Sequence, residues 1–201
     1  MKIRNVIALA GAAVLFSACI PSVNPFYTEK DVVFDPRLTG EWQTQEKNKT
    51  PEVWKFENVT NTCYHLTITD KDGKQGEFEA HLLKLKQEHF LDIIPADCKY
   101  ATNQADLVAA SMFPGHLLLR VPQLAPELKL AFFDFDWLEK YLKANPQALA
   151  HRHEDKSILL TAGTRDLQRF VLKHLGKDEL FKEPEDFARN TNAIPGTVPP
   201  Q

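Results

Sequence analysis

The 201-residue chain has few of the features that mark unusual classes of protein. Its eight glycines are too few for a collagen-like repeat, and 43% apolar with 25% charged residues is typical of a folded globular protein rather than of a coiled coil or a disordered chain. It has 24 basic against 27 acidic residues, so it lacks the positive surplus that nucleic-acid binding needs. A chain of this length can build one hydrophobic core but hardly two, and we expect a single domain.

Long apolar runs are also missing, since the longest, residues 6–16, has only 11 residues. A membrane-spanning helix requires about 20. With Lys2 and Arg4 before it, this run has the charged start and the short apolar centre of an export signal. We therefore expect residues 1–18 to be a removable signal peptide, whose loss leaves 22 basic and 27 acidic side chains, a charge of −5.

The residues that end this signal indicate lipidation. Ser17 and Ala18 directly before Cys19 resemble the lipobox of bacterial lipoprotein precursors, although Phe16 takes the place of the usual Leu, which sits one residue further back. In that family the cysteine is diacylated, becomes the new N-terminus and is acylated again. The resemblance implies a lipid anchor on Cys19, and two or more acyl chains hold a protein firmly to a membrane. The alternative is an uncleaved signal, or a soluble secreted protein with a chance cysteine.

Two further resemblances concern the cell envelope. By the sorting pattern of bacterial lipoproteins, Ile20 in place of an Asp after the cysteine implies the outer membrane, with the protein facing the periplasm. Residues 24–28 together with residues 40–42 are similar to the entry segment of uncharacterised envelope lipoproteins. That second resemblance implies no activity.

Proline divides the rest of the chain. Pro21, Pro25 and Pro36 prevent a regular helix in residues 19–38, which we expect to be the lipidated cysteine and an extended tether whose apolar later part lies on the domain surface. Residues 39–189 then form a single globular domain. Residues 190–201, rich in proline and poor in apolar residues, are expected to be a disordered tail.

The hydrophobic period changes once along the domain, from 2 to 3.6. Strand-like alternation occupies residues 52–59, 63–70, 76–85, 89–95, 117–121 and 128–133, with an Asp-Gly turn at residues 70–74. Helical spacing follows in residues 137–142, capped by Asp134 or Asp136, and from a Thr164 cap through residue 175, with a strand at 157–162 between them and a last helical turn at 185–189. The pattern predicts an α+β fold, in which a strongly curled or closed, barrel-like antiparallel sheet of about 7–9 strands is followed by C-terminal helices.

Gly40, Glu41 and Trp42, at the start of the first strand, are similar to the G-x-W that opens lipocalin and related calycin barrels. The resemblance implies an up-and-down barrel, from which helices between the late strands are a departure. Under it, Trp42 is either a core residue or a ligand contact.

Cys63 and Cys98 are the only thiols besides Cys19. An exported chain meets an oxidising compartment, where a cysteine pair tends to form a disulfide. Closing this loop of 34 residues would stabilise the fold by about 3–4 kcal/mol. Because Cys63 should point away from the main core and Cys98 lies in a polar loop, two unpaired thiols are an equal alternative.

The histidines give a weak metal signal. His151 and His153 would share one face of a strand and could share a zinc ion, but no third ligand has recognisable spacing, so a solvated pair is the simpler interpretation. His65, His81 and His89 alternate with apolar positions and are expected on the outer face or the edge of the sheet.

Acidic residues and catalytic motifs are equally unspecific. Asp134, Asp136 and Glu139 could form an acid pair or a calcium site, but carboxylates at the start of a helix also complement its dipole. The chain has no G-x-S-x-G, no P-loop and no G-x-G-x-x-G, and we expect no cofactor.

Two charged residues stand within apolar strands. Asp92 and Arg120, paired inside a barrel, could bind a polar head group. Charges are seldom fully buried, however, which favours the alternative that both face solvent while Leu91, Ile93, Leu117, Leu119 and Val121 point inward.

The longest irregular stretch, residues 96–115, is expected to cover the sheet as a lid. Met112 and Phe113 would offer adaptable apolar contacts to a ligand or a partner. Residues 101–110 should then be removable without loss of folding.

These observations lead to three hypotheses of function. The first is a non-catalytic, lipid-anchored envelope lipoprotein whose barrel-like domain binds a small apolar molecule or another envelope protein. The second is an envelope hydrolase with catalytic groups among Asp92, Asp134, Asp136 and the histidines. The third is a purely structural interaction module. A closed apolar cavity would favour the first, convergent carboxylates the second and a broad exposed apolar patch the third.

Overall fold

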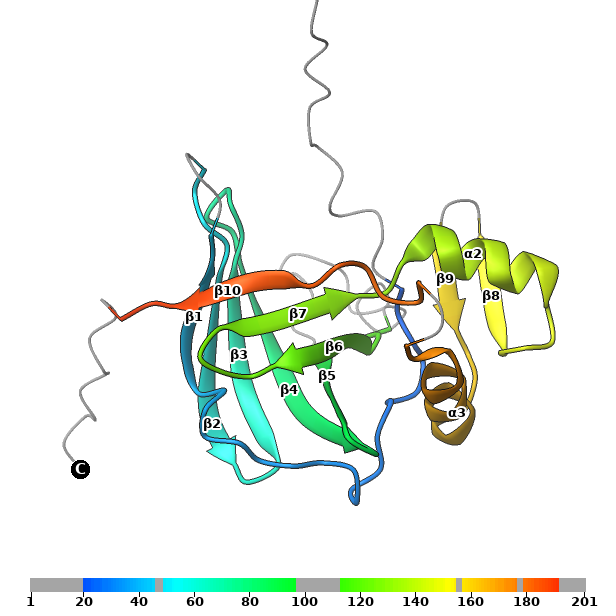
Figure 1. Ribbon diagram of the computed structural model, residues 1–201, viewed down its shortest axis with the longest axis horizontal. Helices are drawn as coiled ribbons and strands as arrows, with labels where there is room; N and C mark the ends of the chain where they lie inside the picture. Colours follow the sequence, from blue (N-terminus) through cyan, green and yellow to red (C-terminus); the bar gives the residue numbers. More distant parts are fainter. Residues whose placement is uncertain (1–19, 46–48, 97–112, 155–156, 177–178, 192–201) are drawn as a thin grey trace, which may run out of the picture.

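The computed structural model describes residues 20–45, 49–96, 113–154, 157–176 and 179–191. They form a β-barrel with a layer of two helices and a small sheet beside it (Figure 1). The signal peptide, Cys19, Cys98 and Met112 lie outside the described residues, as do residues 192–201 of the predicted tail. Within the described ranges, no helix is both long and apolar enough to cross a membrane.

Eight antiparallel strands close the barrel. In chain order they are β1 (Gly40–Thr44), β2 (Val53–Thr60), β3 (Cys63–Thr69), β4 (Gln75–Leu85), β5 (Glu88–Pro95), β6 (Leu117–Gln123), β7 (Leu128–Phe132) and β10 (Glu185–Arg189). The first seven follow one another around the barrel, and β10 pairs with both β7 and β1 to complete it. The predicted closed antiparallel sheet and α+β class are confirmed.

Side chains from all of these strands fill the interior of the barrel. Trp54 and Phe56 on β2, and Tyr64 and Leu66 on β3, alternate with outward residues as the sequence predicts, and each is at most 2% exposed. The remaining buried residues of this core are Leu38, Trp42, Ala80, Leu82, Leu91, Ile93, Leu119, Val121, Leu124, Leu128, Leu130 and Phe187. Eight strands enclose a space that side chains alone can fill, and here they do.

The barrel closes where β1 pairs with β10, and this contact involves Gly40, Trp42 and Arg189. The indole Nε1 of Trp42 donates to the carbonyl of Leu38 at 2.8 Å, and the guanidinium of Arg189 lies 4.2 Å from the centroid of the Trp42 ring. Gly40 has a φ of +126°, which residues with a side chain rarely adopt, and a Cβ there would also meet Nη1 of Arg189. The backbone therefore favours glycine at this position, and the Trp42 ring two residues later provides the face on which the Arg189 guanidinium lies.

The second layer is inserted between β7 and β10. It consists of α2 (Phe135–Ala144), β8 (His151–Glu154), β9 (Ser157–Leu160) and α3 (Thr164–His174), with β8 and β9 forming a separate two-stranded sheet. Asp134 caps α2 as the sequence predicts, since its Oδ1 accepts from the N–H of Trp137 at 2.7 Å. The N-cap of α3 is Gly163 rather than the expected Thr164.

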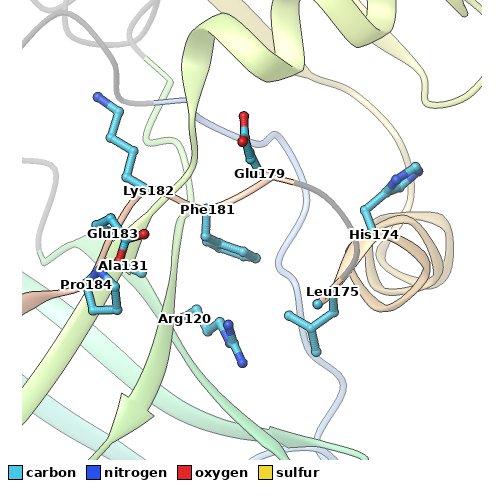
Figure 2. A pocket seen from close by; sticks show the side chains of 10 residues that line it. Arg120, Ala131, His174, Leu175, Glu179, Phe181, Lys182, Glu183 and Pro184 are labelled. Atoms are coloured by element: carbon cyan, nitrogen blue, oxygen red, sulfur yellow. The ribbon is translucent and has the colours of Figure 1, made fainter.

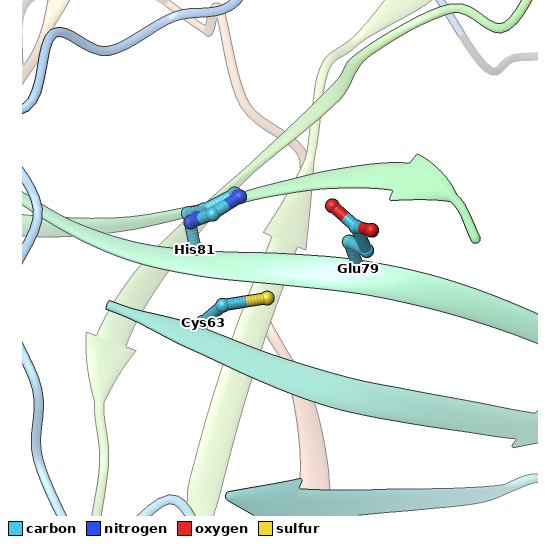
Figure 3. Close-up of side chains that lie close together, drawn as sticks. All are labelled: Cys63, Glu79 and His81. Atoms are coloured by element: carbon cyan, nitrogen blue, oxygen red, sulfur yellow. The ribbon is translucent and has the colours of Figure 1, made fainter. Parts of the chain in front are cut away.

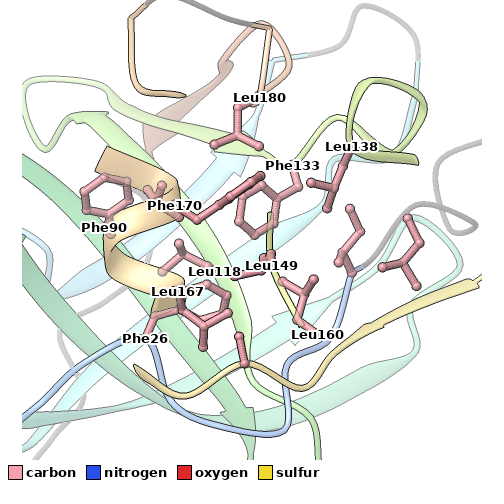
Figure 4. Close-up of a cluster of buried hydrophobic side chains, with 14 of the residues drawn as sticks. Phe26, Phe90, Leu118, Phe133, Leu138, Leu149, Leu160, Leu167, Phe170 and Leu180 are labelled. Carbon is pink, nitrogen blue, oxygen red and sulfur yellow. The ribbon is translucent and has the colours of Figure 1, made fainter. Parts of the chain in front are cut away.

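A second hydrophobic core joins this layer to the outer face of the barrel (Figure 4). The barrel contributes Leu83, Leu85, Phe90, Leu118 and Phe133, whereas the layer contributes Leu138, Leu142, Leu149, Ile158, Leu160, Ala162, Leu167, Phe170, Val171 and Leu180. His174, expected on the apolar stripe of its helix, packs there between the rings of Tyr141 and Phe170. The barrel sheet therefore packs against one hydrophobic core on its inner face and another on its outer face.

Residues 20–38, expected as a tether, are part of the folded domain. Ile20 is 2% exposed and Phe26 is 1% exposed, and both belong to the second core. Ser22 exchanges backbone hydrogen bonds with His116 at 2.8 and 2.9 Å, and the N–H of Leu160 donates to the carbonyl of Pro21. The prolines do prevent a helix here, and the apolar later part lies on the domain as expected, but the segment is already docked by its apolar side chains from Ile20 on.

Residues 185–189, expected as a last helical turn, form strand β10 instead. Phe187 points into the barrel between neighbours that face outward, and it packs against Trp54 with ring centroids 5.6 Å apart. Five residues with one inward side chain carry little periodicity, so pairing with β1 and β7 decides the conformation. The domain therefore ends in a strand rather than in helices.

Candidate functional site

Three places in the domain are candidates for a functional site: the barrel interior, the surface cavities and the outer face of β3 to β5. In the interior, Trp42 is fully buried between Leu38 and Arg189, which favours a core residue over a ligand contact. The side-chain packing around it is that of a core. The inward positions expected for Leu91, Ile93, Leu117, Leu119 and Val121 are confirmed, since four of them are buried in the barrel core and Leu117 is partly buried against it.

The structure does not bring Asp92 and Arg120 together inside the barrel, and it does not expose Asp92 to solvent. Both residues point outward, and Arg120 forms an ion pair with Glu88 at 2.9 Å. Asp92 is fully buried beneath the N-terminal segment, where Oδ2 accepts from the N–H of Phe26 at 2.8 Å and Oδ1 lies 2.7 Å from Nδ1 of His116. Its burial is possible because both carboxylate oxygens have partners.

Among the cavities that the described residues form, two lie on the surface outside the barrel. One, of about 350 Å³, is lined by residues of β6 and β7 and by the chain after α3, and Figure 2 shows Arg120, Glu179, Phe181 and Lys182 around it. The other, of about 430 Å³, lies between α3 and residues 146–150. The first has side chains of both charge signs, so its chemistry does not select one class of ligand.

The acidic and histidine clusters considered in the sequence are divided among separate interactions. Asp134 is the cap of α2, and Glu139 is bonded to His153 at 2.9 Å and to Lys143 at 3.0 Å. Nδ1 of His151 lies 2.8 Å from the carbonyl of Leu149. These distances describe local structural bonds rather than a shared metal or a pair of catalytic acids.

The outer face of β3 and β4 carries a cluster that sequence reasoning missed. Cys63, Glu79 and His81 bring a thiol, a carboxylate and an imidazole within 4.8 Å of one another (Figure 3). Among the described residues this is the group with the composition and spacing of a metal site. The separate expectations that Cys63 points away from the core and that His81 lies on the outer face are confirmed.

The signal that could have found this cluster is the register of the hairpin. The turn at residues 70–74 pairs Thr69 with Gln75, and counting outward pairs Tyr64 with Ala80. Cys63 and His81 are then the next pair on the outer face, with Glu79 two residues before His81.

Tyr27, from the N-terminal segment, packs against one member of this cluster. Its ring lies against that of His81 with centroids 4.6 Å apart. Burial, followed by the negative charges of Asp92, Cys63 and Glu79, raises the pKa of the Tyr27 phenol to about 12. Burial and the charge of Glu79 likewise raise the pKa of the Cys63 thiol. The surroundings therefore disfavour additional negative charge.

Cys63 is a free thiol in this structure, and its Sγ donates weakly to the carbonyl of Tyr64 at 3.6 Å. Its suggested partner Cys98 lies outside the described residues, so the disulfide stays a prediction. Phe113 is 54% exposed and its role as a contact residue stays a prediction, whereas Met112 and most of the suggested lid lie outside the described residues.

Comparison of the chain with protein-family models, with curated proteins and with solved structures finds no match.

Proposed function

We propose that this chain is a lipid-anchored envelope protein, held against the membrane through Cys19, and that its barrel domain is a binding module for another envelope protein. The single observation that carries the anchoring is the burial of Ile20, the residue that directly follows the lipobox cysteine. The described chain is packed into the domain from this residue on, and a mature lipoprotein would begin one residue before it.

The same observation supports one orientation of the domain at the membrane. Adjacent α-carbons are only about 3.8 Å apart, and Ile20 is packed into the second core. A lipid on Cys19 would therefore hold the domain at the bilayer surface without a free linker. The side of the domain around Ser22, His116 and Leu160, to which this segment is bonded, would face the membrane.

The preference for a protein partner over a small apolar molecule rests on the filled barrel. Trp54, Phe56, Tyr64 and Phe187 occupy the interior with exposed fractions of 0–2%. A small apolar ligand would need to displace these side chains, whereas a protein can use the outer surface.

The hydrolase hypothesis has less support, because its carboxylates serve other partners. Asp92 is bonded to Phe26 and His116, and Asp134 caps a helix. The two carboxylates therefore do not form a catalytic pair. Under the binding hypothesis both residues stabilise the fold, which agrees with their contacts.

Fractionation of cells tests the anchor. The wild-type protein should incorporate radiolabelled palmitate and stay with the membranes, and Cys19→Ser should do neither. Cys98→Ser is the matched control and should behave as the wild type. Labelling and membrane retention of Cys19→Ser would contradict the proposal.

Protease treatment of vesicles tests the missing linker. The wild-type protein in vesicles should resist release, because the first bonds after Cys19 are held in the folded domain. A variant with about ten Gly and Ser residues inserted after Cys19 should be released quickly. Equal release of both would argue for a free tether.

A further inference from the structure

The cluster of Cys63, Glu79 and His81 lies on neighbouring strands, where the pleat fixes the side-chain directions. Because Tyr64 and Ala80 are paired and point inward, the residues next to them point outward together. Figure 3 shows the three side chains projecting from β3 and β4 toward a common space. Two rigid strands of a closed barrel hold their backbones in place.

The distances are close to those of a bound zinc ion. Zinc bonds of about 2.0–2.3 Å in a tetrahedron set the ligand atoms about 3.3–3.8 Å apart. In the structure the three ligand atoms lie within 4.8 Å of one another, so a contraction of at most about 1.5 Å is needed. Glu79 is exposed and has a long, flexible side chain, and it can supply this movement by changing rotamer.

The imidazole of His81 is already oriented for coordination. Its Nδ1 lies 2.7 Å from the carbonyl oxygen of Thr62. A carbonyl can only accept, so Nδ1 carries the hydrogen and the lone pair is on Nε2. A histidine that binds metal through one nitrogen commonly donates from the other to such a carbonyl. The ring of Tyr27 packs against His81 and restricts its rotation.

The charges around the cluster favour a cation. Glu79 belongs to it, and the carboxylate of Asp92 is on the neighbouring strand in register with His81. Burial and Glu79 raise the pKa of the Cys63 thiol, and a dication bound to the sulfur would outweigh both effects by stabilising the thiolate.

We propose that Cys63, Glu79 and His81 form a Zn²⁺ site, with a fourth position open to water or to a donor group from a partner. Thiolate, imidazole and carboxylate are the ligands that zinc uses, and three protein ligands with one open position are typical of its reactive sites. On binding, the Cys63 thiol transfers its proton to water and the sulfur bonds to the metal, with no change of oxidation state. This site is independent of the anchor on Cys19, so one proposal can fail without the other.

The site requires Cys63 to remain reduced. A disulfide with Cys98 would remove one of the three ligands, so the disulfide and the zinc site exclude each other. The metal experiment is therefore made on the full chain purified in detergent and treated with a phosphine reductant and a chelator, both of which are then removed.

The probes are Zn²⁺ alone and Co²⁺ alone. One equivalent of Zn²⁺ should bind at the site, and Co²⁺ should give the charge-transfer absorption of a cobalt–thiolate bond. Cys63→Ser should abolish that absorption, and His81→Gln and Glu79→Gln should each weaken Zn²⁺ binding more than about tenfold. Cys98→Ser and His89→Gln are matched controls and should bind both ions as the wild type does.

Circular dichroism and thermal unfolding separate a lost site from a lost fold. Zn²⁺ should raise the unfolding midpoint of the wild type, because it binds only the folded state, and should leave the midpoints of folded ligand variants unchanged. If Zn²⁺ fails to bind the reduced wild type, or if the Cys63→Ser variant keeps the cobalt–thiolate absorption, the proposal is wrong.

Discussion

Asp92 on β5 accepts a hydrogen bond from the backbone N–H of Phe26, with 2.8 Å between Oδ2 and N, across 66 residues of chain. This bond fastens the N-terminal segment to the outer face of the barrel. The second carboxylate oxygen, Oδ1, contacts His116, whose backbone is bonded to Ser22 of the same segment. One buried carboxylate therefore supports the contact between the barrel and the N-terminal segment, directly at Phe26 and through His116 at Ser22.

Replacing this carboxylate should destabilise the domain. We expect Asp92→Ala to lower the free energy of unfolding by about 2–4 kcal/mol, because the buried N–H of Phe26 loses its acceptor and His116 loses its partner. Urea denaturation measures the change. Asp72→Ala, in the exposed turn, is the control and should stay within about 0.5 kcal/mol of the wild type. Equal stability of Asp92→Ala and the wild type would show that the segment is held by its apolar contacts alone.

The glycine of the barrel closure gives a second prediction. Gly40→Ala should lower the free energy of unfolding by about 2–4 kcal/mol, because its φ of +126° disfavours a side chain and the added Cβ would meet Arg189. Gly73→Ala separates these effects, since Gly73 has a φ of +80° and nothing within 4 Å of the added atom. Its cost should be about 1 kcal/mol. Thermal unfolding measures both variants. Equal losses of unfolding free energy in Gly40→Ala and Gly73→Ala would contradict this prediction.

The filled interior leads to a third prediction. Phe56→Ala should cost about 3–5 kcal/mol, since the ring is fully buried between Trp54 and Tyr64. The cavity left behind should allow a small apolar probe such as benzene to stabilise the variant but not the wild type. Val59→Ala, at a position 61% exposed, is the control for stability. Stabilisation of the wild type by the probe would indicate an open interior and would revive the small-ligand hypothesis.

Acid should loosen the contact between the N-terminal segment and α3. The pKa of Asp31 is below its ordinary value, because the opposing effect of burial is outweighed by hydrogen bonds from the N–H and hydroxyl of Thr28 and from Nε2 of Gln168. A lowered folded pKa means that this stabilisation is complete above the ordinary pKa of about 3.9 and is lost as the pH falls through the folded value. Asp31→Asn should therefore be less stable than the wild type near neutral pH, and the difference should shrink on acidification. Urea denaturation at several pH values measures it, and a difference that grows in acid would refute the assignment.

The sequence predicts best the strands that alternate over a long stretch. Phe78, Ala80 and Leu82 on β4 point inward at every second position, and the Asp-Gly turn before them sets the register of the hairpin. Such signals are local and survive in a single sequence. Strand β10 is different, because five residues with one inward ring acquire their conformation from partners far away in the chain.

The N-terminal segment and the candidate zinc site show a second limit. The prolines indicate correctly that residues 20–38 contain no regular helix, but they do not reveal that Ile20 and Phe26 are docked in a core built from residues 83–180. Cys63 and His81 were each expected on the outer face, yet only the strand register makes them neighbours. A sequence pattern predicts the direction in which a side chain points, whereas the pairing of strands determines which side chains lie next to it.

The most direct test of the account is the mass of the N-terminal peptide of the protein purified from membranes. The peptide should begin at Cys19, carry a diacylglycerol thioether and an amide-linked acyl chain, and continue directly with Ile20. An N-terminus at any other residue, or a Cys19 thiol without lipid, would contradict the anchoring on which the proposed function depends.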